Sequence, residues 1–403
     1  MKTELPHARA RALPAVCVAV NRARLLDTAV RLVAEPSPTR SAGPAADALA
    51  AILTEDGFTV ERVVAGHAAS PAVVVRFDSG RAGRTLQFDG HLDTVHLPFV
   101  PPAVVGHRLT GSGSADMKGG IAAAVEALRA VRDAGGLAGG SILLTAHDLH
   151  ESPWGDGSQL DALIRSGCVG DAVLIPEYFN SALPVIGRGG FIWAADIRRP
   201  GPPVHEVNRP DEPSVIATGA KLVARLERLD GELSRNSDPL AGASSAFVGT
   251  IRSGTIYNEY PQSCRLEGTR RWLPGTKFAD ADREFRDLCG EVARETRTTI
   301  DVETRLMRDA FLLDTADPFV GVFQTTCATL CGGALLPGGK PFVDDGNTFH
   351  ALAGVPAITH GPTAGGAHTV AEWVDIDDLV RVARLYALIA SIYCPDTSER
   401  STR

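Results

Sequence analysis

His91 and Asp93 lie two residues apart, where a short apolar stretch, R-T-L-Q-F, is expected to end as a buried strand. Residues two apart on extended backbone point to the same side. A carboxylate beside an imidazole can accept one ring N–H, which leaves the other nitrogen free to bind a metal ion. A lone pair of this kind is more often a hydrogen-bonded loop pair, so the interpretation depends on the rest of the chain.

Asp116 lies between a Gly/Ser loop, G-S-G-S, and a stretch with the periodicity of a helix, M-K-G-G-I-A-A-A-V-E-A-L. An acidic group near a helix N-terminus is easily kept ionised. A carboxylate that bridges two metal ions must be ionised, so Asp116 is a candidate bridging ligand.

Three further residues of ligand type follow expected strands. Glu151 comes shortly after S-I-L-L-T-A, Glu177 directly after A-V-L-I-P, and His368 after P-A-I-T-H. In open α/β sheets, the loops at the carboxyl ends of the strands converge on one crevice. With His91 and Asp116, the set contains two histidines and three carboxylates, which suits two zinc-like divalent ions. Such a pair of ions can activate water and polarise a carbonyl.

Strands and helices alternate along the first and last parts of the chain, which favours an α/β fold with a doubly wound sheet. The middle part instead predicts the order β-α-β-β-α-β of a ferredoxin-like unit, inserted as a domain of its own. The expected division is residues 1–188 and 309–403 for the catalytic domain and 189–308 for the insert. Helices are expected at 22–34, 44–57, 120–134, 160–166, about 212–229, about 278–298, 317–331 and 375–392.

Composition limits the classes of partner. The 403 residues carry a net charge of -8, with no basic run, which argues against nucleic acid. No apolar stretch reaches the ~18 residues of a membrane span, and the first twenty residues are expected to form an irregular extension. Seven scattered cysteines give no disulfide framework, so a cytoplasmic location is expected. Cys327 and Cys331 are expected to share the apolar face of a helix rather than to bind zinc.

Taken in order, these motifs resemble those of the co-catalytic zinc aminoacylase and carboxypeptidase family. That family includes acetylornithine deacetylase, succinyl-diaminopimelate desuccinylase and bacterial glutamate carboxypeptidase. The similarity runs from about residue 22 to 393 and implies a zinc-aminopeptidase-like doubly wound sheet with an inserted ferredoxin-like lid and dimerisation domain. It implies two divalent ions, zinc by preference with cobalt or manganese as alternatives. The implied ligands are His91 and Glu177 for one ion, Glu151 and His368 for the other, and Asp116 between them, with Asp93 supporting His91.

The resemblance also implies substrate-binding residues. G-R-G-G gives Arg188, N-E-Y-P gives Asn258, and R-W-L-P-G gives Arg271, a clamp for a substrate carboxylate. D-D-G-N places Asp345 near the site. His205 matches the histidine that reaches the partner subunit's site to hold the developing oxyanion, which implies a homodimer formed through the lid. Two alternatives stay open: Arg271 pairs with a lid carboxylate, and His205 is a solvated loop residue.

The chain departs from the family pattern at one position. The family has two adjacent glutamates, first the general base and then a metal ligand, whereas this chain reads H-D-L-H-E-S-P-W-G. Glu151 keeps the ligand place and His150 stands at the base. A shifted register, with Glu151 as the base, would put Ser152 on the metal. An unperturbed pKa of ~6.5 suits histidine to proton transfer, but His150 could instead be structural or bind metal. His147 and Asp148 are expected to form the loop's hydrogen-bonded scaffold.

The sequence thus predicts a binuclear metal-dependent amidohydrolase with His150 as catalytic base. Its substrate would be a small molecule with a carboxylate, an N-acyl amino acid or a dipeptide-like compound. Two alternatives stay open: a repurposed family member that forms amides or performs another acyl transfer, and a metal-holding pseudo-enzyme that binds a ligand.

Overall fold

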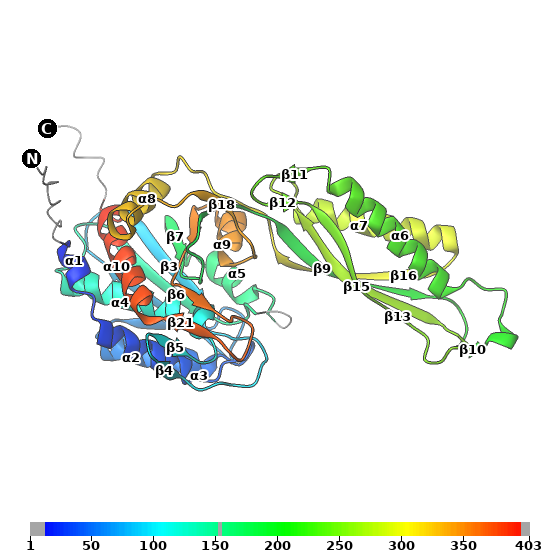
Figure 1. Cartoon of the computed structure of the whole chain (residues 1–403), viewed down its shortest axis with the longest axis horizontal. Coiled ribbons are helices and arrows are strands. Elements are labelled where there is room, and N and C mark those ends of the chain that lie inside the picture. The colour runs from blue at the N-terminus through cyan, green and yellow to red at the C-terminus, as the bar shows by residue number, and fades with distance from the viewer. Residues whose placement is uncertain (1–12, 152–154, 396–403) are drawn as a thin grey trace, which may run out of the picture.

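A computed structural model describes residues 13–151 and 155–395 of the chain (Figure 1). The protein is elongated and has two parts. The part on the left of Figure 1 contains the beginning and the end of the described chain, and the part on the right comes from its middle. Residues 1–12 and Ser152 lie outside the described residues. Residues Ala15–Val18 form a short helix, α1, so the expectation of an irregular extension is wrong there.

The first part is built on a six-stranded sheet of order β1-β2-β6-β3-β7-β19. The four strands β6, β3, β7 and β19 run parallel, while β1 and β2 are added antiparallel at one edge. The strands are β1 Val60–Val63, β2 Ala72–Asp78, β3 Thr85–His91, β6 Ser141–His147, β7 Ala172–Ile175 and β19 Ala357–Thr359.

Helices cover both faces of this sheet, which confirms the doubly wound α/β prediction. On one face, side chains of several helices pack with Phe88 and Leu144 in a single core. On the other, Leu163 of α5 packs against Val74 and Leu143. Because both faces are covered, the central strands β3 and β6 are buried along almost their whole length, including the polar residues Gln87 and Asp89. The helices are α2 Arg22–Val33, α3 Gly43–Glu55, α4 Gly119–Asp133, α5 Ser158–Arg165, α8 Pro318–Cys331 and α10 Ile376–Tyr393.

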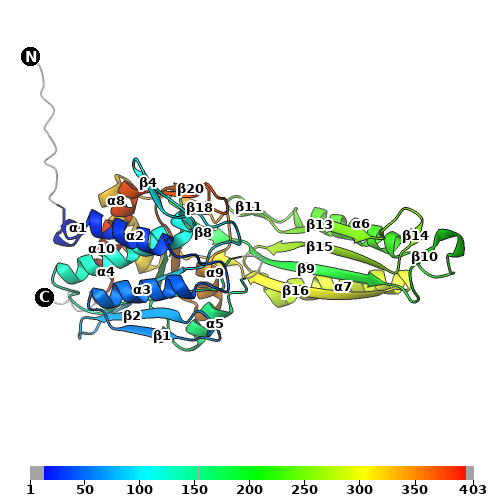
Figure 2. The ribbon, with the colours of Figure 1, turned by 90° about the horizontal axis from the view of Figure 1, so that it is seen from below.

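The second part is an antiparallel sheet of order β13-β15-β9-β16 with α6 and α7 on one face (Figures 1 and 2). Its elements are β9 Gly189–Arg198, α6 Val215–Leu233, β13 Ser245–Ser253, β15 Ser263–Trp272, α7 Phe278–Thr296 and β16 Thr299–Arg308. This is the β-α-β-β-α-β order that the sequence predicts. Trp193, Trp272 and Phe285 lie in its own core. The two ends of the unit meet, because Gly190 pairs with Arg308.

Short elements that the sequence does not predict complete the fold. They are too brief for an alternating pattern to reveal them, and β4, β5, β20 and β21 form a small sheet that ties the segment after His91 to the C-terminal loops. They are β4 Ala103–Val105, β5 Arg108–Thr110, β8 Leu183–Gly187, β10 Val204–His205, β11 Ser237–Asp238, β12 Gly242–Ala243, β14 Glu259–Tyr260, β17 Phe311–Leu312, β18 Pro337–Gly339, α9 Asp345–Thr348, β20 Ala364–Gly365, β21 Trp373–Asp375, and the single-turn or π-helical segments η1 Ser114–Lys118, η2 Glu206–Asn208 and η3 Phe349–Ala353.

Among the helices of residues 13–151 and 155–395, none combines the length and the apolar character that crossing a bilayer requires.

Candidate metal centre

Parallel strands bring the candidate ligands to one edge of the central sheet. His91 is the last residue of β3, Glu177 follows the end of β7 by two residues, and Glu151 follows the end of β6 by four. Asp116 reaches the same place from η1, because α4 packs against the chain after β7. A Cβ atom on Gly120 would lie 1.8 Å from the carbonyl oxygen of Pro176, so only glycine allows this approach.

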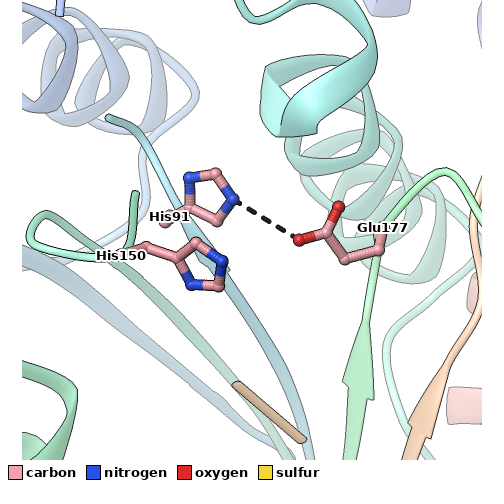
Figure 3. A group of neighbouring side chains, drawn as sticks. All are labelled: His91, His150 and Glu177. Atoms are coloured by element: carbon pink, nitrogen blue, oxygen red, sulfur yellow. Dashed lines mark ion pairs between the residues drawn. The ribbon is translucent and has the colours of Figure 1, made fainter. Parts of the chain in front are cut away.

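The two oxygens of Asp116 face different histidines. Oδ1 lies 3.1 Å from Nε2 of His91, and Oδ2 lies 3.3 Å from Nε2 of His368. Glu177 Oε1 is 3.4 Å from the same nitrogen of His91, the pair joined by the dashed line in Figure 3. A carboxylate oxygen of Glu151 is 3.2 Å from Nε2 of His368. The five side chains therefore form two sets that share Asp116.

Several of these atoms are buried without a hydrogen-bond partner among the described residues. His91 Nε2, Asp116 Oδ1 and Glu177 Oε2 have none, although His91 and Asp116 come within 3.1 Å of each other. Unsatisfied buried polar atoms are rare in native proteins. Nitrogen and oxygen atoms that converge without hydrogen-bonding one another are suited to bind a cation between them. These residues therefore fit a pair of divalent ions.

The ionisation of the cluster supports the same interpretation. Burial, reinforced by the charge of Asp116, raises the pKa of Glu177 to about 8. Hydrogen bonds to Asp116 and Glu151 raise the pKa of His368 to about 10. Burial opposes ionisation of Asp116, but the attraction of the neighbouring His368 and His91 outweighs it and lowers the pKa of Asp116. The cluster thus retains protons near neutrality, and a metal ion would replace them.

Asp93 holds the loop around the cluster in two ways. Nδ1 of His91 lies 3.0 Å from the backbone oxygen of Asp93 and 3.5 Å from its carboxylate, which orients the ring. The same carboxylate accepts hydrogen bonds from the backbone N–H groups of His150, at 3.1 Å, and Glu151, at 2.9 Å. Asp93 therefore positions one histidine and the start of the loop that carries Glu151.

His150 lies beside the cluster. Its ring stacks on that of His91, with ring centres 3.9 Å apart and planes 8° from parallel (Figure 3). Nδ1 lies 2.9 Å from Oδ1 of Asp345, so the other nitrogen is left to face the cavity that His150 lines. Ligand atoms of His91, His150 and Glu177 also lie within 4.8 Å of one another, so the arrangement accommodates a base or a third nitrogen ligand.

Asp345 lies near the site, as the sequence predicts, but it is fully buried and is not among the residues that line the cavity. Besides His150, it contacts Nη2 of Arg308 at 3.1 Å and Nε2 of His147 at 3.3 Å. Its carboxylate lies behind the ring of His150 and not in the cavity wall. His147 also contacts Asp89 at 3.4 Å, so the prediction that it belongs to a scaffold is confirmed.

The scaffold includes Asp148, as the sequence predicts. Its carboxylate accepts hydrogen bonds at 2.9 Å from the backbone N–H groups of Arg40 and Ala42, and another from that of Leu149. Leu149 has a φ of +70°, which is unusual for a residue with a branched side chain. The hydrogen bond supports this turn, which presents His150 and Glu151 to the cluster.

A cavity of about 250 Å³ opens in front of the cluster, and its far wall is basic. Arg271, Arg305 and Arg308 line it together with Tyr178 and Phe342. Burial and the charge of Arg188 lower the pKa of Arg271, and no ion pair of Arg271 is found among the described residues. The alternative pairing with a lid carboxylate instead applies to its neighbour Arg270, which contacts Glu284 at 2.8 Å.

Two predicted site residues, His205 and Asn258, lie away from this cavity within the one chain, and a third, Arg188, does not line it. His205 and Asn258 are neighbours near β10, at the far end of the second part in Figure 1, with His205 Nε2 3.0 Å from Asn258 Nδ2. Arg188 donates to the backbone oxygen of Ala243 at 2.9 Å. The structure therefore does not bring Asn258 to Arg271 in one clamp, because the length of the second sheet separates their elements.

Sequence reasoning missed Glu372 and Arg308. Glu372 is a single acidic residue in an apolar stretch, V-A-E-W-V, and its side chain is 6% exposed. An isolated acid at a buried strand start is the signal that could have identified it. Arg308 gives no comparable signal, because its role depends on Asp345, which is remote in the sequence.

The chain is similar to proteins of known family. The model of peptidase family M20/M25/M40 matches residues 88–391. A succinyl-diaminopimelate desuccinylase of Sphingopyxis alaskensis is 27% identical over 381 residues, which cover 90% of this chain and 96% of that protein. The structure of aminopeptidase PepT from Bacillus cereus has a TM-score of 0.77 at 21% identity, covering 93% of this chain and 99% of that one. The YXEP protein of Bacillus subtilis, described as a dinuclear metal binding peptidase, has a TM-score of 0.65 at 15% identity, with coverages of 92% and 98%.

Proposed function

Because the chain belongs to peptidase family M20/M25/M40, whose members are hydrolytic metalloenzymes, we propose that it is a dinuclear metal-dependent amidohydrolase. Its substrate would be an N-acyl amino acid or a small dipeptide-like molecule that carries a carboxylate. The observation that carries the proposal is Asp116, whose two oxygens face His91 and His368 at 3.1 and 3.3 Å.

The proposed ligands are His91 and Glu177 on one side of Asp116, and Glu151 and His368 on the other. When bound, a pair of divalent ions activates water and polarises the substrate carbonyl. Zinc fits these nitrogen and oxygen donors, and cobalt or manganese would be accepted as well.

The residues around the ligands would do the rest of the chemistry. His150 would accept the proton of the attacking water at Nε2 and pass it to the leaving amine. Asp345, at 2.9 Å from Nδ1, would hold the ring in the tautomer that this transfer needs. Arg271 would hold the substrate carboxylate, since a half-buried guanidinium without an acidic partner among the described residues is suited to a bound anion.

The second part would act as a lid and as the contact between two subunits. His205 and Asn258 lie at its far end, together with Ile256 and the 93% exposed Tyr257. We propose that a homodimer places this end over the partner subunit's cavity, where His205 would hold the oxyanion. The domain division at residues 188 and 308 and the cytoplasmic location belong to the same proposal. The seven free cysteines are in keeping with that location.

A second candidate is amide formation or another acyl transfer with the same ions and clamps. His150 favours this second candidate. It stands where the family pattern has a glutamate base, and loss of that base would suit a reaction in which free hydrolysis is unwanted. The two candidates differ in whether water is the acceptor of the acyl group.

A panel of N-acyl amino acids and dipeptides, assayed with and without added zinc, tests the proposal. We expect zinc-dependent release of a free amine, greatest for substrates with a free carboxylate. Zinc-dependent transfer of the acyl group to an amine, without release into water, would favour the second candidate. Turnover that is independent of any added or bound metal would contradict both.

A further inference from the structure

The carboxylate of Glu372 is buried against the loop that carries Asp116. Its Oε2 accepts a hydrogen bond from the backbone N–H of Gly113 at 2.8 Å. Its Oε1 accepts two more, from Ala115 at 3.0 Å and from Asp116 itself at 2.8 Å. Three donors of one short loop thus converge on one side chain that comes from a segment more than 250 positions away.

Glu372 also closes the loop that carries His368. That loop begins at Gly366, whose φ is +73°, and a Cβ atom there would lie 2.4 Å from the backbone oxygen of Ala371. Within it, His368 has a φ of +60°, and the backbone N–H of Thr369 donates to Gly366 at 3.0 Å. The turn is therefore compact, and its end is fixed where Glu372 begins the connection to β21.

The backbone of Glu372 joins the same two loops. Its carbonyl oxygen accepts the N–H of Gly111 at 3.2 Å, and the next residue, Trp373, pairs with Thr110 of β5. One residue thus connects the Asp116 loop and the His368 loop through both side chain and backbone.

We infer that Glu372 is a positioning residue that fixes Asp116 and His368 relative to each other, and so sets the affinity of the ion held between them. The inference rests on the proposed function, because it assumes that the two side chains are ligands. Outer partners that orient ligand groups are typically worth 10- to 100-fold in metal affinity. The effect should be larger for the ion shared with His368 and Glu151 than for the ion shared with His91 and Glu177, since the first depends on both loops.

The test compares Glu372→Gln with wild type and with Asp375→Ala. Glutamine keeps the size of the side chain but turns one acceptor into a donor that faces a backbone N–H. Asp375 caps α10 by accepting the N–H of Asp378 at 2.9 Å in the same segment, and among the described residues no hydrogen bond joins its side chain to the Asp116 loop. Asp375→Ala should therefore lower the melting temperature of the metal-free protein at least as much as Glu372→Gln does, without disturbing the metal ligands.

The readouts are the number and affinity of Zn²⁺ ions bound by metal-free protein and the rise in melting temperature that Zn²⁺ produces. We expect two ions in wild type and in Asp375→Ala. In Glu372→Gln we expect one ion to bind about 10- to 100-fold more weakly, with a smaller rise in melting temperature.

Two results would overturn the inference. If Glu372→Gln binds both ions with wild-type affinity and only its metal-free melting temperature falls, Glu372 serves stability alone, and the proposed function is unaffected. If wild type itself binds no ion, the proposed function fails and the inference fails with it.

Discussion

Nδ1 of His150 lies 2.9 Å from Oδ1 of Asp345, and the same carboxylate also contacts Arg308 and His147. A buried carboxylate that accepts one ring N–H fixes the tautomer of a histidine. Coulombic attraction to Asp345 outweighs the opposing effect of burial and raises the pKa of His150. Asp345 is thus the partner that would hold the ring of His150 in one tautomer for the proposed proton transfer.

This pairing leads to a prediction for His150→Ala and Asp345→Asn. Loss of a general base typically lowers the rate by ~10²–10⁴, so His150→Ala should reduce kcat by that order with little change in KM. Asp345→Asn keeps the shape but not the charge, and should reduce kcat less. Steady-state kinetics on the best substrate of the panel would measure both.

His150→Glu is the matching variant. If the native reaction is hydrolysis, the His150→Glu variant should retain activity, because the family pattern that the sequence resembles has a glutamate at this position. Hydrolysis that appears only in His150→Glu would show that the wild-type protein uses another reaction. A fully active His150→Ala would show that His150 is not the base.

Arg271→Met should raise KM by about 10- to 100-fold, as loss of a charge-assisted hydrogen bond implies. The loss should be confined to substrates with a free carboxylate, so an amide analogue should bind equally to wild type and variant. Arg252→Met is the control, since Arg252 is an exposed arginine of the same sheet that contacts Glu267 at 3.1 Å. Equal loss with carboxylate and amide substrates would contradict the clamp.

His205 should act in the partner subunit's site. His205→Asn and His91→Ala subunits should each be nearly inactive alone. After subunit exchange in equal amounts, half of the dimers are mixed and each has one complete site, so activity should recover to about a quarter of wild type. No recovery in verified mixed dimers would contradict a role across the interface.

Cys331 does not share the buried apolar face with Cys327, contrary to expectation. Cys327 is buried, whereas Cys331 is exposed at the end of α8, with its sulfur 3.1 Å from Nη1 of Arg381. A hydrogen bond from Cys327, and then the charge of Arg381, lower the pKa of Cys331 to about 6. The thiolate is the reactive form, so we expect the fraction of Cys331 that can react to rise with pH through about pH 6.

Alkylation by iodoacetamide measures this directly. In the folded protein, Cys331 should react first, with a rate that is half-maximal near pH 6, and Arg381→Met should move the midpoint upward. A midpoint at the ordinary thiol value of ~8.5 would contradict the assignment.

Local pattern was sufficient for the long elements and for the residues that follow strands. The eight expected helices are present with ends displaced by at most four residues, because apolar periodicity marks the buried face of each. His91, Glu151, Glu177 and His368 lie together because the carboxyl ends of parallel strands meet, which is a rule of topology rather than of sequence distance.

Contacts between remote side chains could not be predicted in the same way. The contact of Asp345 with His150 and that of Asn258 with His205 join residues that are far apart in the sequence. Each of these contacts depends on where the tertiary fold places a loop relative to a distant part of the chain. Glu372 was missed for the same reason, since its three backbone donors come from another part of the chain.

Metal content tests the central claim most directly, which is that five dispersed side chains hold two divalent ions shared by Asp116. The protein is dialysed against a chelator, reloaded with Zn²⁺ and freed of excess metal. Inductively coupled plasma mass spectrometry should then find two zinc ions per chain. His368→Ala should keep one ion and Asp116→Asn should hold neither tightly. A wild-type protein that retains no zinc, or one whose turnover survives complete removal of metal, would contradict the account.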